Sequence, residues 1–292
     1  MDEGFVTANG VRLHYVAKGA GERIVFIHGF PEFWQAWQHQ LDDFGKDHCA
    51  IALDMRGYNL SDKPEGVDAY SVDVLLEDVR AFIQSFGPEP VVVVAHDWGG
   101  VCAWHFAAKY PELTRKLVII NSPHPATLYR ELKTNEAQRD AMRYVLTFRK
   151  PTADALLCEN DFARLAKLFE SWEIGGHKLS PDTVAAYKAA WAQPGALDAM
   201  LNYYRATNIH PPGPNAPGVM GFEPDLSQWL VRVPTQVIWG EQDGALLPAL
   251  LDGLQDYVPD LRIDRVPEGS HWVAHEFPER VNGLIREFLS DG

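Results

Sequence analysis

Basic residues and pairable cysteines are scarce in this sequence. Its 26 lysines and arginines face 40 aspartates and glutamates, which gives a formal net charge of −14. A field of that sign repels phosphate backbones and anionic lipid headgroups, so nucleic acid and a membrane surface are excluded as expected partners. The three cysteines (Cys49, Cys102 and Cys158) cannot all pair with one another and match no zinc-site spacing. We therefore expect a reduced, cytoplasmic protein.

Long hydrophobic runs and a secretory leader are missing as well. The longest wholly apolar runs, such as residues 91–95, are far shorter than the roughly 20 residues that span a bilayer. Residues 1–6 contain neither a basic nor an apolar leader segment, so no secretory signal is expected. The sequence has no Gly-x-Gly-x-x-Gly and no His-Glu-x-x-His, and it predicts neither a cofactor nor a bound metal.

Short runs of β-branched and aliphatic residues are abundant, in a chain of 292 residues of which 46% are hydrophobic. They are continuous rather than alternating, which is typical of parallel strands buried on both faces. Helical patterns over residues 70–86 and 99–109 lie between them, so the alternation predicts βαβ units and an α/β fold with a doubly wound sheet. The runs are residues 24–27, 50–53, 91–94, 117–120 and 236–239, and a further strand pattern follows at 261–266.

Two further patterns complete the expected organisation. Residues 5–7 and 12–16 flank an Asn-Gly pair and predict an antiparallel hairpin ahead of the parallel strands. The alternation of strand and helix stops after residue 120, and residues 125–206 look helical throughout. The sequence thus predicts a core domain of residues 1–124 and 223–292, interrupted by a helical lid at residues 125–222.

The strongest chemical signal is the strand at 91–94, which runs into Ala-His-Asp-Trp-Gly-Gly at residues 95–100 and then a helix. Sites in open parallel sheets lie at the carboxyl ends of the strands. The small residues around Asp97 permit the sharp turn of a nucleophile elbow. A carboxylate at that point can attack a saturated carbon and form an ester that water must later cleave. A plain helix N-cap is the alternative for Asp97 taken alone.

Several segments resemble the motifs of the α/β-hydrolase superfamily and, within it, the epoxide hydrolases. They are His-Gly-Phe-Pro at residues 28–31, Asp-Met-Arg-Gly-Tyr at 54–58, His-Asp-Trp-Gly-Gly at 96–100 and Asn-Ser-Pro-His-Pro at 121–125. The resemblance covers essentially the whole chain. It implies an α/β-hydrolase fold, a mostly parallel sheet with helices on both faces and a helical lid after the sixth strand. It also implies an oxyanion hole made by the backbone N–H groups of Phe30 and Trp98.

A general base and an orienting acid must accompany Asp97. His271 follows the last strand pattern, where hydrolases of this fold place the base, although His275 is close enough to be mistaken for it. The acid is expected after the strand at 236–239, where the family's Gly-x-x-Asp pattern favours Asp243 over Glu241. Such a carboxylate fixes the tautomer of the base and stabilises its protonated form.

The resemblance also implies two lid tyrosines that donate hydrogen bonds to the epoxide oxygen. Tyr204 directly precedes an arginine in the segment 201–205, and Tyr144 lies seven residues before a proline. Tyr203, Tyr129 and Tyr187 are alternatives, and simple core packing of aromatic residues would explain any one of these positions.

The function expected from the resemblance is a cofactor-independent epoxide hydrolase that acts on a small apolar epoxide and water. The two residues of the expected oxyanion hole and the two lid tyrosines are also expected to contact the substrate (Phe30, Trp98, Tyr144 and Tyr204). Haloalkane or haloacid dehalogenases with the same nucleophile, and a non-catalytic binding protein of the same fold, are the alternatives. A serine esterase is disfavoured because the chain has no Gly-x-Ser-x-Gly. A homodimer is compatible with the sequence, since two-fold dimers are the commonest oligomers.

Overall fold

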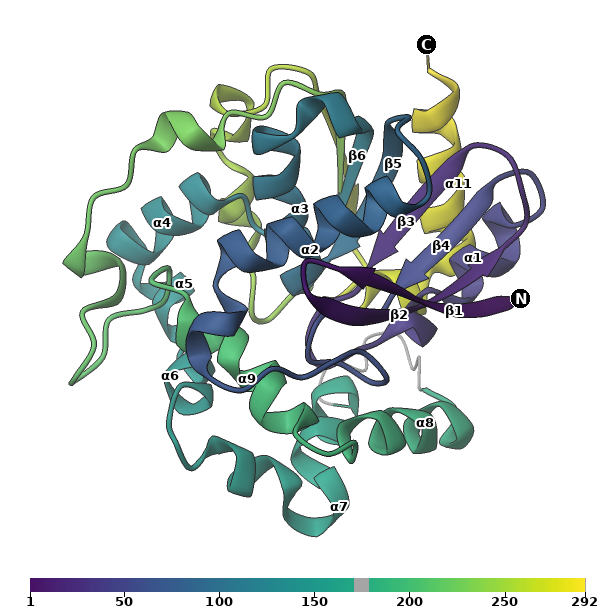
Figure 1. Ribbon diagram of the computed structural model, residues 1–292. Coiled ribbons are helices and arrows are strands. Elements are labelled where there is room, and N and C mark those ends of the chain that lie inside the picture. Colours follow the sequence, from purple (N-terminus) through teal and green to yellow (C-terminus); the bar gives the residue numbers. More distant parts are fainter. Residues whose placement is uncertain (171–178, 292) are drawn as a thin grey trace.

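A single eight-stranded sheet forms the centre of the molecule (Figure 1). The structure is a computed structural model and describes residues 1–170 and 179–291. The strand order is β1-β2-β4-β3-β5-β6-β7-β8, and all neighbours are parallel except the pairs β1–β2 and β2–β4. The strands are β1 (Asp2–Ala8), β2 (Val11–Lys18), β3 (Arg23–Ile27), β4 (Cys49–Leu53), β5 (Val91–His96), β6 (Thr114–Ile120), β7 (Thr235–Gly240) and β8 (Leu261–Val266).

Helices flank the sheet and build the lid between β6 and β7. The sheet helices are α1 (Gln38–Phe44), α2 (Val72–Ser85), α3 (Asp97–Lys109), α10 (Val273–Glu276) and α11 (Pro278–Ser290). The lid helices are α4 (Pro125–Thr134), α5 (Glu136–Ala141), α6 (Tyr144–Phe148), α7 (Ala153–Glu170), α8 (Pro181–Trp191) and α9 (Ala196–Ala206). In Figure 1 the teal and green lid helices lie at one end of the sheet, away from both chain termini.

Successive residues of the inner strands point into two different apolar cores. Val25 and Ile27 of β3 lie in the core that includes α2 and α3. Ile24 and Phe26 of the same strand lie in the core that includes α1 and α11. Because both faces of the sheet are covered, an inner strand needs an apolar residue at every position, which explains why the strand patterns are continuous.

The sequence-based expectations for the sheet are confirmed, whereas the part of the expected helical stretch at residues 171–178 lies outside the described residues. All eight strands are present, and the first two form the expected hairpin around Asn9 and Gly10, whose φ angles are 49° and 78°. The helix expected from residue 99 begins two residues earlier, at Asp97. The break inside α7 at Glu159–Phe162, where the backbone leaves helical geometry, was not expected. Within the described residues, no helix is long and apolar enough to cross a membrane.

Candidate active site

Asp97 stands at the sharp turn from β5 into α3. Its φ of 48° lies in the left-handed region, which aspartate tolerates better than most residues other than glycine. The side-chain oxygen Oδ1 accepts a hydrogen bond of 2.7 Å from the Phe30 N–H. The backbone oxygen of Asp97 accepts one of 2.7 Å from the Ser122 hydroxyl. The turn therefore presents the Asp97 carboxylate at the carboxyl edge of the sheet, with one oxygen already bound.

Two glycines allow the loop after β3 to approach this turn closely. A Cβ atom at Gly29 would overlap the side chain of Asp97, and one at Gly99 would overlap the carbonyl oxygen of Ile27. Trp98, the expected second oxyanion donor, is the second residue of α3, where backbone N–H groups lack an intrahelical acceptor. Among the described residues, its N–H makes no hydrogen bond to the Asp97 carboxylate, whereas that of Phe30 does.

His271 and Asp243 reach Asp97 from the loops after β8 and β7. The Nδ1 atom of His271 lies 2.7 Å from Oδ2 of Asp243, and Nε2 lies 3.7 Å from Oδ2 of Asp97. The runner-up acid Glu241 is paired with Arg265 instead, at 2.7 Å. The structure thus brings together the three residues expected as nucleophile, base and acid.

Asp243 is buried and fully engaged in hydrogen bonds. Its Oδ1 accepts bonds of 2.8 Å from the N–H groups of Ala245 and Leu246, and its Oδ2 accepts one of 2.9 Å from the Asn121 side chain. Burial raises the pKa of Asp243, but the charge on His271 and these hydrogen bonds hold the pKa below its usual value. The side chain of Asn121, directly after β6, thus supports the acid that follows β7.

Opposing effects determine the protonation of His271. Burial lowers the pKa of its imidazole, but the charges of Asp243 and Asp97 and the hydrogen bond to Asp243 raise the pKa to about 9. At neutral pH the resting site therefore holds an imidazolium between two carboxylates. To act as a base, the ring must first lose this proton, which becomes easier when one of the neighbouring negative charges is removed.

A buried cluster around Glu32 was not anticipated from the sequence. Its carboxylate accepts hydrogen bonds from His96 at 3.0 Å, His275 at 2.6 Å and the hydroxyl of Tyr187 at 3.3 Å. The other ring nitrogen of His96 lies 2.9 Å from the backbone oxygen of His271. Burial raises the pKa of Glu32, but the two histidines hold it well below its usual range. His275, the alternative base, is therefore committed to Glu32.

Sequence alone could not have identified this cluster. Glu32 directly follows the motif at residues 28–31 and His96 begins the motif at residues 96–100, but they are separated by 64 positions and nothing in either motif shows that they pair. The cluster connects the loop after β3, the end of β5, the loop that carries His271 and the lid helix α8. It is placed to hold these four elements in register around Asp97.

Tyr144 and Tyr204 stand on the lid side of Asp97. Their rings are 6.4 Å apart, and the ring of Tyr204 packs edge-on against that of Trp98 at 5.1 Å. Burial and the charge of Asp97 raise the pKa of both phenols well above the ordinary value. Both hydroxyls therefore keep their protons at neutral pH and can act only as hydrogen-bond or proton donors toward an anion.

The three alternative tyrosines have their hydroxyls engaged elsewhere. Tyr203 donates to the backbone oxygen of Arg56 at 2.7 Å, and Tyr129 donates to that of Phe222 at 2.8 Å. The hydroxyl of Tyr187 donates to the buried carboxylate described above. None of the three lines either of the cavities that contact Asp97.

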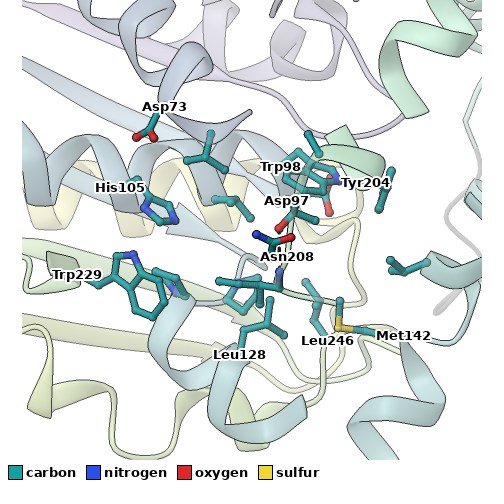
Figure 2. A pocket seen from close by; sticks show the side chains of 18 of the residues that line it. Asp73, Asp97, Trp98, His105, Leu128, Met142, Tyr204, Asn208, Trp229 and Leu246 are labelled. Carbon is teal, nitrogen blue, oxygen red and sulfur yellow. Dashed lines mark hydrogen bonds between the residues drawn. The ribbon is translucent and has the colours of Figure 1, made fainter. Parts of the chain in front are cut away.

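Two cavities meet at Asp97, Tyr144 and Tyr204, which line both. The large cavity has a volume of about 290 Å³, and the small cavity has a volume of about 180 Å³. Figure 2 shows the large cavity, with Asp97, Trp98 and Tyr204 at one end and His105 and Trp229 at the other. The small cavity is also lined by Phe30, Phe148, Leu168, Ala245, His271 and Trp272.

The charges around the cavities favour a neutral ligand. No lysine or arginine of the described residues lines either cavity, whereas Asp97 and Asp73 do line the large one. A ligand carboxylate in the large cavity would therefore meet two carboxylates and no lysine or arginine among the described residues. No group of three His, Cys, Asp or Glu side chains in the described part of the chain could hold a metal ion.

Comparison with known proteins agrees with this geometry. Residues 22–278 match the family described as the alpha/beta hydrolase fold. The chain is 40% identical to the AB hydrolase superfamily protein YfhM of Bacillus subtilis, over 98% of this chain and 97% of that protein. It is 36% identical to epoxide hydrolase 4 of Mus musculus, over 97% of this chain and 77% of that protein.

Solved structures give the same result. A crystal structure of the epoxide hydrolase of Bacillus megaterium with an inhibitor has a TM-score of 0.91 and 39% identity, covering 99% of this chain and 100% of that one. A variant of that enzyme, solved with its product (R)-3-[1]naphthyloxy-propane-1,2-diol, has a TM-score of 0.89, 39% identity and the same coverage. The chain belongs to the α/β-hydrolase family and, within it, to the epoxide hydrolases.

The pKa of His271 provides a first test of this electrostatic arrangement. We expect an NMR titration of the His271 ring in the folded protein to give a pKa near 9, and Asp97→Asn to lower this pKa because one of the two flanking charges is lost. An exposed histidine titrates near pH 6.5. A His271 pKa at or below that value in the unmodified protein would contradict the arrangement.

The same shift predicts how stability depends on pH. Because the folded pKa of His271 is raised, its protonation stabilises the fold fully below about pH 6.5, and this contribution is lost as the pH rises through about 9. The free energy of unfolding, measured with urea, should therefore fall between these pH values, and it should fall less in His271→Gln.

Proposed function

We propose that the protein hydrolyses epoxides to vicinal diols through a covalent ester on Asp97. The observation that carries the proposal is that the two oxygens of the Asp97 carboxylate have different neighbours, each suited to a different step. Oδ1 of Asp97 is held by the Phe30 N–H, Oδ2 lies 3.7 Å from the His271 ring, and two protonated tyrosines line the same cavities. These are the groups that ring opening and ester hydrolysis require.

In the first step, Oδ2 of Asp97 attacks one carbon of the epoxide ring. A C–O ester bond forms as the ring C–O bond breaks, and the electron pair of that bond stays on the epoxide oxygen. The alkoxide is a poor leaving group unless it receives a hydrogen bond or a proton. Tyr144 and Tyr204 supply this donation, since burial keeps their hydroxyls protonated.

In the second step, water attacks Cγ of Asp97 in the ester. Esterification removes the negative charge of Asp97, one of the causes that raise the pKa of His271, so the ring more readily takes its neutral form. Neutral His271 accepts the water proton, and Asp243 stabilises the imidazolium. The oxyanion develops on Oδ1, which the Phe30 N–H already contacts. The Cγ–Oδ2 bond then breaks, and Oδ2 leaves with the diol, taking the remaining proton of the attacking water. Asp97 is thus restored as a carboxylate beside the imidazolium, and the proton that His271 gave up before water attack balances the alkoxide of the first step.

The cavity linings support a neutral, largely apolar substrate with one larger substituent. Aliphatic and aromatic side chains dominate both linings, and the large cavity has the volume for an aryl group. A related enzyme from Bacillus megaterium forms a naphthyloxy diol, which is compatible with such a cavity. No lysine or arginine among the described residues lines either cavity to pair with a substrate carboxylate, which disfavours a haloacid substrate.

Intact-mass measurement on His271→Gln tests the proposal. Without the base, the ester should accumulate, so incubation with an aryl glycidyl ether should raise the protein mass by the mass of the whole epoxide. The gain should disappear when Asp97→Ala is added, and it should be absent in the control His39→Gln, which changes an exposed histidine on α1.

Two outcomes would contradict it. A mass gain from a haloalkane equal to the alkyl group without its halogen, with no gain from the epoxide, would assign the chain to the dehalogenases. Failure of folded His271→Gln to form any adduct, although the unmodified protein consumes the epoxide, would rule out the ester.

The tyrosines provide a separate prediction. In Tyr144→Phe/Tyr204→Phe, the rate of ester formation should fall on the order of 10²–10⁴-fold, the range of acid–base catalysis. Quenched single-turnover reactions measure this rate. Tyr129→Phe is the matched control, because Tyr129 lines neither cavity and its hydroxyl donates to the backbone oxygen of Phe222. Equal rates in the double variant and the control would remove the tyrosines from the mechanism.

A further inference from the structure

One face of α3 runs along the large cavity. Asp97, Val101 and His105 are spaced four residues apart, so their side chains lie on the same side of the helix, and all three line the cavity. At 1.5 Å per residue, His105 is about 12 Å along the helix axis from Asp97. Figure 2 shows His105 and Trp229 at the end of the cavity opposite Asp97 and Tyr204.

The ring of His105 is a polar group that lines this end of the cavity. It is half-buried and meets the ring of Trp229 edge-on, with centroids 5.9 Å apart. Among residues 1–170 and 179–291, it has no hydrogen-bond partner. A half-buried polar group in this state gains from a ligand that pairs with it.

The protonation of His105 determines what it can bind. Burial lowers its pKa to about 4, with only partial opposition from the charge of Asp73. At neutral pH the ring is uncharged, with one nitrogen that donates and one that accepts a hydrogen bond. The ligand group that pairs best with this neutral ring is an uncharged one that has both a hydrogen-bond donor and an acceptor.

The neighbouring residues agree with this preference. The side chains of Asn208 and Gln228 line the same cavity and carry both donors and acceptors. Asp73, at the first turn of α2, lines it as well and repels an anion. In the small cavity, the described lining residues other than Asp97, His271 and the two tyrosines are apolar. As far as the described residues line them, the large cavity is therefore the one of the two that suits a polar substituent.

Resting on the proposed function, we infer that the preferred substrates are epoxides whose larger substituent ends in a neutral hydrogen-bonding group, such as an amide or an alcohol, which His105 binds. His105 is then a specificity-determining residue two helical turns from the nucleophile. A site built around a hydrogen-bonding group discriminates against an analogue that lacks it, because its own polar atoms are left unpaired.

Two aryl glycidyl ethers of similar size test the inference. One carries a carbamoyl group and the other an isopropyl group, each in the para position, across the ring from the oxirane. For the unmodified protein, kcat/KM should be about tenfold higher for the carbamoyl ether, the effect of roughly one net hydrogen bond. In His105→Phe this ratio should fall to about one. The ratio is taken on one preparation, so a loss of folded protein cannot mimic the effect.

Further variants sharpen the test. His105→Gln retains a donor and an acceptor and should retain a preference for the carbamoyl ether. The control His39→Phe, an exposed histidine of α1, should show the unmodified ratio. A para-carboxyl ether should be the poorest substrate, because Asp73 and Asp97 repel it.

The possible outcomes distinguish the role of His105 from the epoxide hydrolase activity on which it rests. Turnover of both ethers with the same ratio in the unmodified protein and in His105→Phe would overturn the role of His105 and leave the epoxide hydrolase in place. A preference for the carboxyl ether would also overturn it. Turnover of none of the ethers by the unmodified protein would overturn the function and the inference together.

Discussion

The buried ion pair between His271 and Asp243 is the interaction on which the site depends. Burying two opposite charges is costly, and it is tolerated only where the geometry is good and the remaining polar atoms are satisfied. Here Asp243 meets that condition with bonds from two backbone N–H groups and the side chain of Asn121. These contacts require β6, β7 and β8 to lie side by side, so the parallel sheet is the precondition of the chemistry.

Around this pair, charged groups lie close to Asp97, and most of the residues that line the two cavities are apolar. Asp97 has the His271 ring on one side and the Phe30 N–H on the other, while the lid contributes aromatic rings. In such surroundings hydrogen bonds and charges act more strongly than in water. The Glu32 cluster adds a second buried negative charge behind His271 and links the loops that carry the reacting groups.

Much of the fold was predictable because the position of an element in the sheet restricts which residues its own segment can contain. A strand covered on both faces must be apolar throughout, and the elbow at Asp97 must have small neighbours. Short stretches of sequence are therefore enough to locate the strands and the elbow. The break in α7 at Glu159–Phe162 has no such signature, since glycine and proline are absent from it.

The site was predictable only where a motif names the residue. The pairing of Glu32 with His96 depends on tertiary structure, as does the support of Asp243 by Asn121, and no local pattern encodes either. The tyrosines are an intermediate case. Motif contexts favoured Tyr144 and Tyr204 but left Tyr203, Tyr129 and Tyr187 open, and only the structure shows that the hydroxyls of these three meet other acceptors, as for Tyr203 on the backbone of Arg56.

The covalent ester is the central claim, and isotope labelling tests it most directly. A single turnover with protein in excess over epoxide, in water enriched in the heavy oxygen isotope, traces the oxygen that water supplies. In the proposed mechanism water attacks Cγ of Asp97, so the heavy oxygen should appear in the peptide that contains Asp97 and not in the diol. Heavy oxygen in the diol, with none in that peptide, would show that water attacks the epoxide directly and would contradict the account.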